Sequence, residues 1–255
     1  MNLACRLSSA CLLAFFFLFV SGCNGNAPDK SVKAPATAES KLQPIDPATT
    51  ASVSGVISFE GTAQAPQKID MSADPACKGD NSWQPIIVDN GKLANVLVYV
   101  KDGLGERPFD PPSTVVRVEQ KGCTYQPHVA AVMAGQPVEF DDNDMTMHNV
   151  HPKPKNNKEW NQAEQPDGKP ITRTFDSPEV MIPVGCNQHP WMKMYLSVMS
   201  NPFFAVTGPD GSFTLKGLPP GTYTIAAVQE KLGEKTQTIT VGPKEDKQGV
   251  KFSFQ

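Results

Sequence analysis

Ten residues, "GCNQHPWMKM" at 185–194, bring together one thiol, one imidazole and two thioethers in a chain with only four histidines. Thiolate, imidazole and thioether donors in one place suit a copper ion that cycles between Cu(I) and Cu(II). A structural zinc site would need four strong ligands, usually with two or more thiolates. A calcium or magnesium site would need clustered carboxylates. The segment therefore predicts a copper site.

Three of the six cysteines lie beyond residue 23, namely Cys77, Cys123 and Cys186. An odd number of cysteines in an exported protein requires an explanation. The simplest one is a disulfide between Cys77 and Cys123, with Cys186 held as a thiolate by the metal. The alternative is that Cys77 and Cys123 are both free and buried, and the spacing along the chain leaves this open.

The N-terminal segment predicts export. Residues 1–22 carry one basic residue, Arg6, and the apolar run "CLLAFFFLFV", which together are typical of a signal peptide. The stretch "VSGC" resembles the lipobox of bacterial lipoproteins, which implies cleavage before Cys23 and acylation of its sulfur; an ordinary signal peptide is the alternative. Asn24 favours the outer over the inner membrane. We expect a lipid-anchored protein on the periplasmic face of the cell envelope.

Residues 23–51 are rich in Pro, Ala, Thr and Ser and poor in large apolar residues, so we expect an acylated cysteine followed by a flexible tether. From residue 52 onward, short runs with period-two alternation, such as "TVVRVEQ" and "GTYTIAAV", are separated by turn sequences. The predicted fold class is all-β. The formal net charge of −3, without a basic cluster, argues against a nucleic-acid partner.

The stretch "FAVTGPDGSFTLKGLPPGTYTIAAV" resembles the second half of the carboxypeptidase regulatory-like, or transthyretin-like, β-sandwich. "SGVISFEG" at 54–61 and "NVLVYVKDG" at 95–103 fit its first half. The resemblance implies a discontinuous sandwich of residues 52–111 plus 205–255, with an insert at 112–204. Loop closure costs rise slowly with insert length, so such a split is physically acceptable. Two consecutive domains are the alternative.

The insert resembles a cupredoxin, and amicyanin most of all within that family. "AGQPVEF" followed by "MHNVH", and then Cys-x2-His with methionine before "YLSV", carry the resemblance. It implies a Greek-key sandwich with one type-1 copper ion. Asn149 would hydrogen-bond across to the thiolate loop. The implied copper ligands are His148, Cys186, His189 and the axial Met192, with Met194 as the alternative axial ligand.

Other side chains near these motifs have simpler explanations. His151 should point away from His148 because side chains alternate along a strand. His128 is expected to be exposed and Met133 to belong to the core. The acidic run "DDND" at 141–144 is interpreted as the polar end of a strand.

The resemblance implies an electron carrier that transfers single electrons between redox protein partners through small, transient interfaces. The expected docking patch around His189 consists of Pro190, Trp191, Met145 and Met147. The alternatives are a copper protein for storage, delivery or resistance, and a structural or carbohydrate-contacting sandwich with a non-functional insert. We do not expect an enzyme or a small-molecule substrate, since copper enzymes of this kind need several more histidines.

Overall fold

The computed structural model describes residues 44–79 and 81–255, and it contains strands and turns but no helix within those ranges. The all-β prediction is therefore confirmed for this part of the chain. The predicted signal peptide, Cys23 and most of the predicted tether lie outside the described residues. The last tether positions are folded: Ile45 packs against a core, and the Thr49 carbonyl accepts a hydrogen bond from the Lys244 amide. No described helix is long and apolar enough to cross a membrane.

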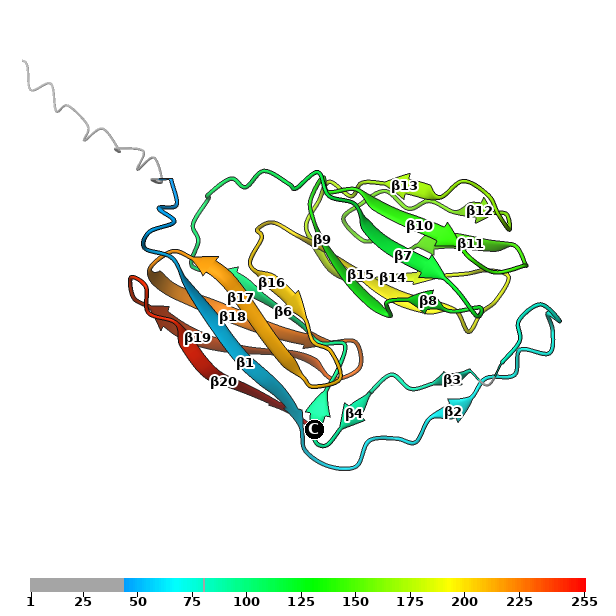
Figure 1. Ribbon diagram of the computed structural model, residues 1–255, viewed down its shortest axis with the longest axis horizontal. Coiled ribbons are helices and arrows are strands. Elements are labelled where there is room, and N and C mark those ends of the chain that lie inside the picture. The colour runs from blue at the N-terminus through cyan, green and yellow to red at the C-terminus, as the bar shows by residue number, and fades with distance from the viewer. Residues whose placement is uncertain (1–43, 80) are drawn as a thin grey trace, which may run out of the picture. The chain divides into compact units, whose positions relative to one another are not determined.

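The first sandwich is built from both ends of the described chain (Figure 1). In one sheet, β1 pairs with β17 in antiparallel and with β20 in parallel. The other sheet has the order β16-β6-β18-β19. The strands are β1 (Ala51–Phe59), β4 (Val88–Asp89), β5 (Lys92–Leu93), β6 (Leu97–Asp102), β16 (Phe204–Val206), β17 (Ser212–Leu218), β18 (Gly221–Gln229), β19 (Gly233–Val241) and β20 (Lys247–Phe254).

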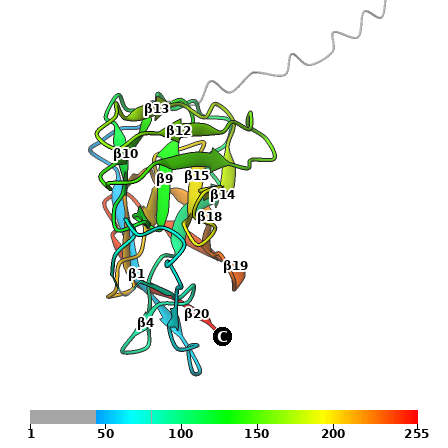
Figure 2. The ribbon, with the colours of Figure 1, turned by 90° about the vertical axis from the view of Figure 1, so that its right-hand side faces the viewer.

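The second sandwich contains the strands between β6 and β16. One sheet has the order β13-β10-β7-β8 and the other β12-β11-β14-β15-β9, of which β9, β14 and β15 are seen close together in Figure 2. The strands are β7 (Val116–Gln120), β8 (Tyr125–Gln126), β9 (Val129–Met133), β10 (Val138–Asp142), β11 (His148–Pro152), β12 (Gln162–Glu164), β13 (Ile171–Arg173), β14 (Glu179–Gly185) and β15 (Lys193–Met199).

Alternation along the strands explains the two cores. In β10, Val138 and Phe140 are fully buried, whereas Glu139 between them is partly exposed. Side chains of a strand point to opposite faces in turn, so one face enters the core and the other meets solvent.

A third apolar cluster, which includes Leu97, Met199 and Ala226, joins strands of both sandwiches. The boundaries of the two predicted domains remain predictions, because the described chain belongs to one compact unit, Leu42–Gln255.

A long excursion, here called the arm (residues 60–87), leaves the first sandwich after β1 and returns at β4. It contains the short pair β2 (Gln67–Lys68) and β3 (Ser82–Trp83). A disulfide between Cys77 and Cys123 joins the arm to the second sandwich, as predicted from the cysteine count. Met71 is 5% exposed in the core of the second sandwich, and the Asn81 side chain donates a hydrogen bond to the Gly122 carbonyl. The arm therefore packs on the second sandwich.

Candidate metal centre

His148 is the first residue of β11, after a turn that joins this strand to β10. Its backbone pairs with Glu164 of β12, and its side chain is fully buried. Strand pairing fixes the direction in which a side chain points. His148 is therefore held in one orientation by the sheet.

The loop between β14 and β15 supplies the other donors. Cys186 follows the last residue of β14, and its amide donates a hydrogen bond of 3.3 Å to the Met192 carbonyl. Inside the loop, the Met192 amide donates to the His189 carbonyl at 2.8 Å. These two bonds close the loop into a tight turn in which Pro190 is compatible with the backbone. Cys186 and His189 are both buried, at 5% and 4% exposure.

Three donor atoms converge at the end of the second sandwich. The Nδ1 atoms of His148 and His189 are 2.9 Å apart, and Cys186 Sγ lies 3.7 Å from His189 Nδ1. All three donors lie within 4.8 Å of one another. Of the cysteines in the described residues, Cys186 is the free one. The structure thus brings together three of the residues predicted as ligands.

The spacing of the donors fits a shared metal ion. Two donors that each bind one ion at roughly 2.0–2.3 Å lie roughly 3.3–3.8 Å apart. The Cys186–His189 separation of 3.7 Å is in this range, and the two Nδ1 atoms would need to separate by a few tenths of an ångström. Two imidazole lone pairs that face one another also need a cation between them, either a proton or a metal ion.

The outer nitrogen of each imidazole is paired with a carboxylate. His148 Nε2 lies 3.0 Å from Asp144 Oδ2, and His189 Nε2 lies 3.0 Å from Asp74 Oδ2, which comes from the arm. A carboxylate that accepts the Nε2 proton leaves the Nδ1 lone pair free for a metal and fixes the ring orientation. Thr146 Oγ1 in turn donates to Asp74 Oδ2 at 2.6 Å. Both imidazoles are therefore oriented as ligands that use Nδ1.

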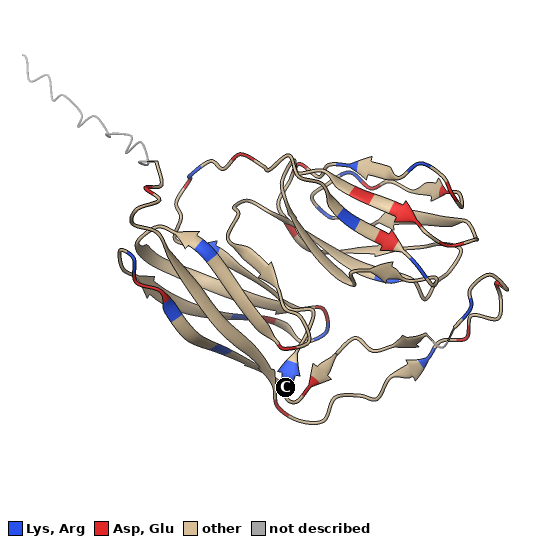
Figure 3. Ribbon diagram, viewed as in Figure 1, with Lys and Arg blue, Asp and Glu red and all other residues tan. Residues whose placement is uncertain are grey.

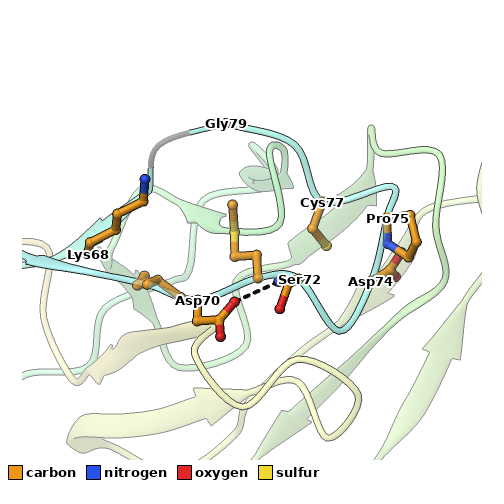
Figure 4. A pocket seen from close by; sticks show the side chains of 9 residues that line it. Lys68, Asp70, Ser72, Asp74, Pro75, Cys77 and Gly79 are labelled. Carbon is orange, nitrogen blue, oxygen red and sulfur yellow. Dashed lines mark hydrogen bonds between the residues drawn. The ribbon is translucent and has the colours of Figure 1, made fainter.

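Figure 4 shows the arm segment from Lys68 to Gly79, in which Asp74, Pro75 and Cys77 follow one another around a bend. The hydrogen bond of the Thr146 hydroxyl, followed by that of the Ala76 amide, lowers the pKa of Asp74 to about 2. Asp74 is therefore an anion at neutral pH and a strong acceptor for the His189 N–H.

Hydrogen bonds favour the thiolate form of Cys186. Burial raises the pKa of this thiol, but the bonds with His148 and with the neighbouring backbone outweigh burial and lower the pKa to about 7. Burial likewise lowers the pKa of His148, but its bonds to Cys186 and Asp144 outweigh that effect and raise the pKa above its ordinary value. A thiolate beside an imidazolium is the arrangement that a soft metal cation replaces by displacing protons.

Asn149 connects the two halves of the site. Its Oδ1 accepts a hydrogen bond of 2.7 Å from the Asn187 amide and one of 3.3 Å from Cys186 Sγ. Its Nδ2 donates to Asn161 Oδ1 at 2.6 Å. Asn149 thus reaches from β11 to the loop that carries Cys186.

The two candidate axial methionines are both buried, at 1% for Met192 and 0% for Met194. In the β14–β15 pair, Val184 is opposite Met194 and Gly185 is opposite Lys193. The next step of this register places Cys186 opposite Met192, and the bond from the Cys186 amide to the Met192 carbonyl joins them. Directly opposite residues of an antiparallel pair have neighbouring side chains on one face. Met192 is therefore two positions of the register closer to Cys186 than Met194 is.

The residues expected to form a docking patch have different environments. Pro190 is exposed, Met145 is 79% exposed, and Met147 accepts a hydrogen bond from Gln165 Nε2 through its sulfur. Trp191 is partly buried: its Nε1 donates to the Cys123 carbonyl at 3.2 Å, and its ring centroid lies 5.1 Å from that of His189. That these four side chains form a docking patch remains a prediction.

Sequence reasoning missed three contacts of this site. Asp74 lies 115 residues from His189, and only its position three residues before Cys77 could have pointed to it. Asp144 and Asp142, interpreted from sequence as the polar end of a strand, face His148 Nε2 at 3.0 and 3.9 Å.

The two remaining histidines lie outside the ligand cluster. His128 was expected to be exposed but is half-buried, with its Nε2 2.9 Å from Glu230 Oε2. His151 bonds to Asn187 and Glu159, away from the metal-ligand cluster.

The solved structures to which this chain is similar include cupredoxins, a class of copper proteins, and a copper-containing nitrite reductase. No family model matches the sequence, and no curated protein matches it.

One of these structures is amicyanin from Paracoccus versutus, which is 21% identical over 40% of this chain and 97% of that chain, with a TM-score of 0.31. A purple cupredoxin from Nitrosopumilus maritimus is 19% identical over 33% of this chain and 99% of that chain, with a TM-score of 0.29. The copper-containing nitrite reductase from Thermus scotoductus SA-01 is 20% identical over 37% of this chain, with a TM-score of 0.32. The match spans only 26% of the length of that reductase.

Proposed function

We propose that this protein binds one copper ion of type 1 and transfers single electrons between redox proteins. The observation that carries the proposal is the convergence of His148 Nδ1, His189 Nδ1 and Cys186 Sγ within 4.8 Å in a buried position. When bound, copper supplies a centre that accepts and releases one electron.

The donor set favours copper over zinc. A structural zinc site is closed by four strong ligands, usually including two or more thiolates. Here Cys186 is the one free thiol of the described residues, because Cys77 and Cys123 are bonded to each other. Two imidazoles, one thiolate and a weak thioether are the set of a blue-copper centre.

Met192 is the proposed axial ligand. The strand register brings it opposite Cys186, whereas Met194 is opposite Val184. Met194 remains the alternative.

The residues around the donors hold them in place. Asp144 and Asp74 orient the imidazoles through Nε2, and Asn149 ties β11 to the loop that carries Cys186. Donors that are fixed by hydrogen bonds move little when the charge of the ion changes, and a small rearrangement favours fast electron transfer. No catalytic activity is proposed, since the remaining histidines, His128 and His151, are bonded to Glu230 and Glu159.

We further propose that the protein acts in the cell envelope, held on the periplasmic face by acylation at Cys23. The support is the sequence "VSGC" after an apolar run. Its partners would be other redox proteins that bind transiently.

The test is a copper titration of the full-length protein, purified in a neutral detergent and followed by visible spectroscopy and potentiometry. We expect one equivalent of Cu(II) to give an intense charge-transfer band that disappears on reduction and returns on oxidation. Cys186→Ser should abolish the band, and His151→Ala, which changes a histidine outside the cluster, should keep it. Stoichiometric binding without colour and without reversible cycling would instead indicate copper storage or delivery.

A further inference from the structure

Access to the donor cluster differs between its two sides. On the arm side, His189 is 4% exposed and its Nε2 atom is covered by Asp74. The disulfide of Cys77 lies beside this pair, since its sulfur, an Asp74 oxygen and a His189 nitrogen fall within 4.8 Å of one another. A redox partner therefore cannot touch the imidazole edge of His189 while the arm is in place.

The other side is open. A pocket of about 360 Å³ is lined by His151, Lys153, Gly185, Cys186, Asn187, Pro190, Met192 and Lys193. Two of these lining residues, Cys186 and Met192, belong to the proposed copper ligands. We call this hollow the lysine pocket.

Strand register explains why the lysine pocket lies there. His151 of β11 is opposite Gly185 of β14, which is opposite Lys193 of β15. These three residues form one row across three neighbouring strands, directly beside Cys186 at the end of β14. Because Gly185 carries no side chain, nothing fills the middle of this row, and the pocket extends to the loop that carries Cys186.

The exposed charges at the rim of the lysine pocket are mainly positive. Lys153 and Lys193 are exposed, and neither forms an ion pair with any carboxylate of the described residues. Within the described part of the chain, the carboxylate that pairs with a side chain of this rim is Glu159, which bonds to His151. On the arm side, Asp74 and Asp144 each pair with an imidazole, and Figure 3 shows acidic residues on strands β7 and β10.

We propose that the lysine pocket is the face on which redox partners dock, and that the partner is a protein with an acidic surface around its cofactor. This inference rests on the proposed electron transfer. With copper bound, one electron would pass between the partner's cofactor and the ion by way of Cys186, a proposed ligand that lines the pocket, and no bond or proton would be exchanged. Charge complementarity with Lys153 and Lys193 selects the partner and raises the encounter rate.

The experiment follows oxidation of the reduced, copper-loaded full-length protein in a stopped-flow instrument at low ionic strength. Two oxidants are compared: anionic hexacyanoferrate(III) and cationic tris(phenanthroline)cobalt(III). The test variant is Lys153→Glu/Lys193→Glu. The matched control is Lys216→Glu/Lys251→Glu, which makes the same charge change on exposed lysines of the first sandwich.

We expect the test variant to react roughly tenfold more slowly with hexacyanoferrate(III) and several-fold faster with the cobalt complex. High salt should remove most of both effects, because it screens exposed charges. A shift in copper potential would change both rates in the same direction, so opposite changes identify a charge effect at the site of approach. The control variant should differ little from the unchanged protein.

Equal rates for the test and control variants, with an intact visible band, would overturn the docking proposal and leave electron transfer standing. Absence of the band or of redox cycling in the unchanged protein would overturn the proposed function itself. Loss of the band in the test variant alone would show that Lys153 or Lys193 supports the ligand loop, which contradicts a docking role. The three results are distinguishable in one series of measurements.

Discussion

Removing the disulfide between the arm and the second sandwich should destabilise the protein by a calculable amount. Cys77 and Cys123 are 46 residues apart along the chain. A cross-link that closes a loop of this length lowers the entropy of the unfolded chain, which corresponds to about 4 kcal/mol at 25 °C. The metal-free Cys77→Ala/Cys123→Ala variant should therefore have a free energy of unfolding lower by about 4 kcal/mol.

The assay is urea unfolding at constant pH without copper, followed by fluorescence. A second reading reports the arm itself: Lys78, next to the disulfide and exposed, should be cut by trypsin faster in the variant. The unchanged protein treated with a reductant is the control and should reproduce both results. A loss below about 1 kcal/mol, or an unchanged rate of cleavage at Lys78, would refute the reasoning.

Three further predictions concern the site and its surroundings. Met192→Leu should shift the reduction potential of the bound copper more than Met194→Leu does, which potentiometry measures. Each substitution should lower the free energy of unfolding by less than about 1.5 kcal/mol, which urea unfolding measures. Burial raises the pKa of Glu164 from 4.5 to about 7. Between these pH values the folded protein holds a proton on Glu164 that the unfolded chain releases, so the free energy of unfolding falls as the pH rises. Glu164→Gln, which cannot ionise, should reduce this fall by about 3 kcal/mol. Urea unfolding at a series of pH values from 4.5 to 8 measures it. Copper at a hundredfold excess over its dissociation constant should stabilise the fold by about 2.7 kcal/mol, and a chelator or Cys186→Ser should abolish this gain.

The strands and the donor residues could be predicted because their signals are local. The alternation in "QPVEFDD" marks β10, and the spacing of Cys186 and His189 identifies a tight loop between two strands. The short pairs β2–β3 and β4–β5 could not be predicted, because two residues are too few to show alternation.

The carboxylates around the imidazoles depend on tertiary structure. Asp74 reaches His189 only because the arm crosses from one sandwich to the other, and the sequence around Asp74 has the composition of any polar loop. Asp144 lies four residues before His148, but its contact depends on the bend of the turn between β10 and β11. Glu230 reaches His128 across 102 residues for the same kind of reason.

The pairing of β1 has a consequence for the order in which the chain can fold during synthesis. β1 is made first among the described strands, yet its main neighbours, β17 and β20, are made only after the second sandwich. Ser58, for example, donates a hydrogen bond to the Phe252 carbonyl, 194 residues away. The second sandwich, β7 to β15, is complete before either neighbour exists. Until then β1 is paired only at its end, where Ser58 is opposite Lys92 of β5, and the rest of both edges is prone to wrong pairing with other strands. Secretion of a still unfolded chain would let β1 meet all its partners at once.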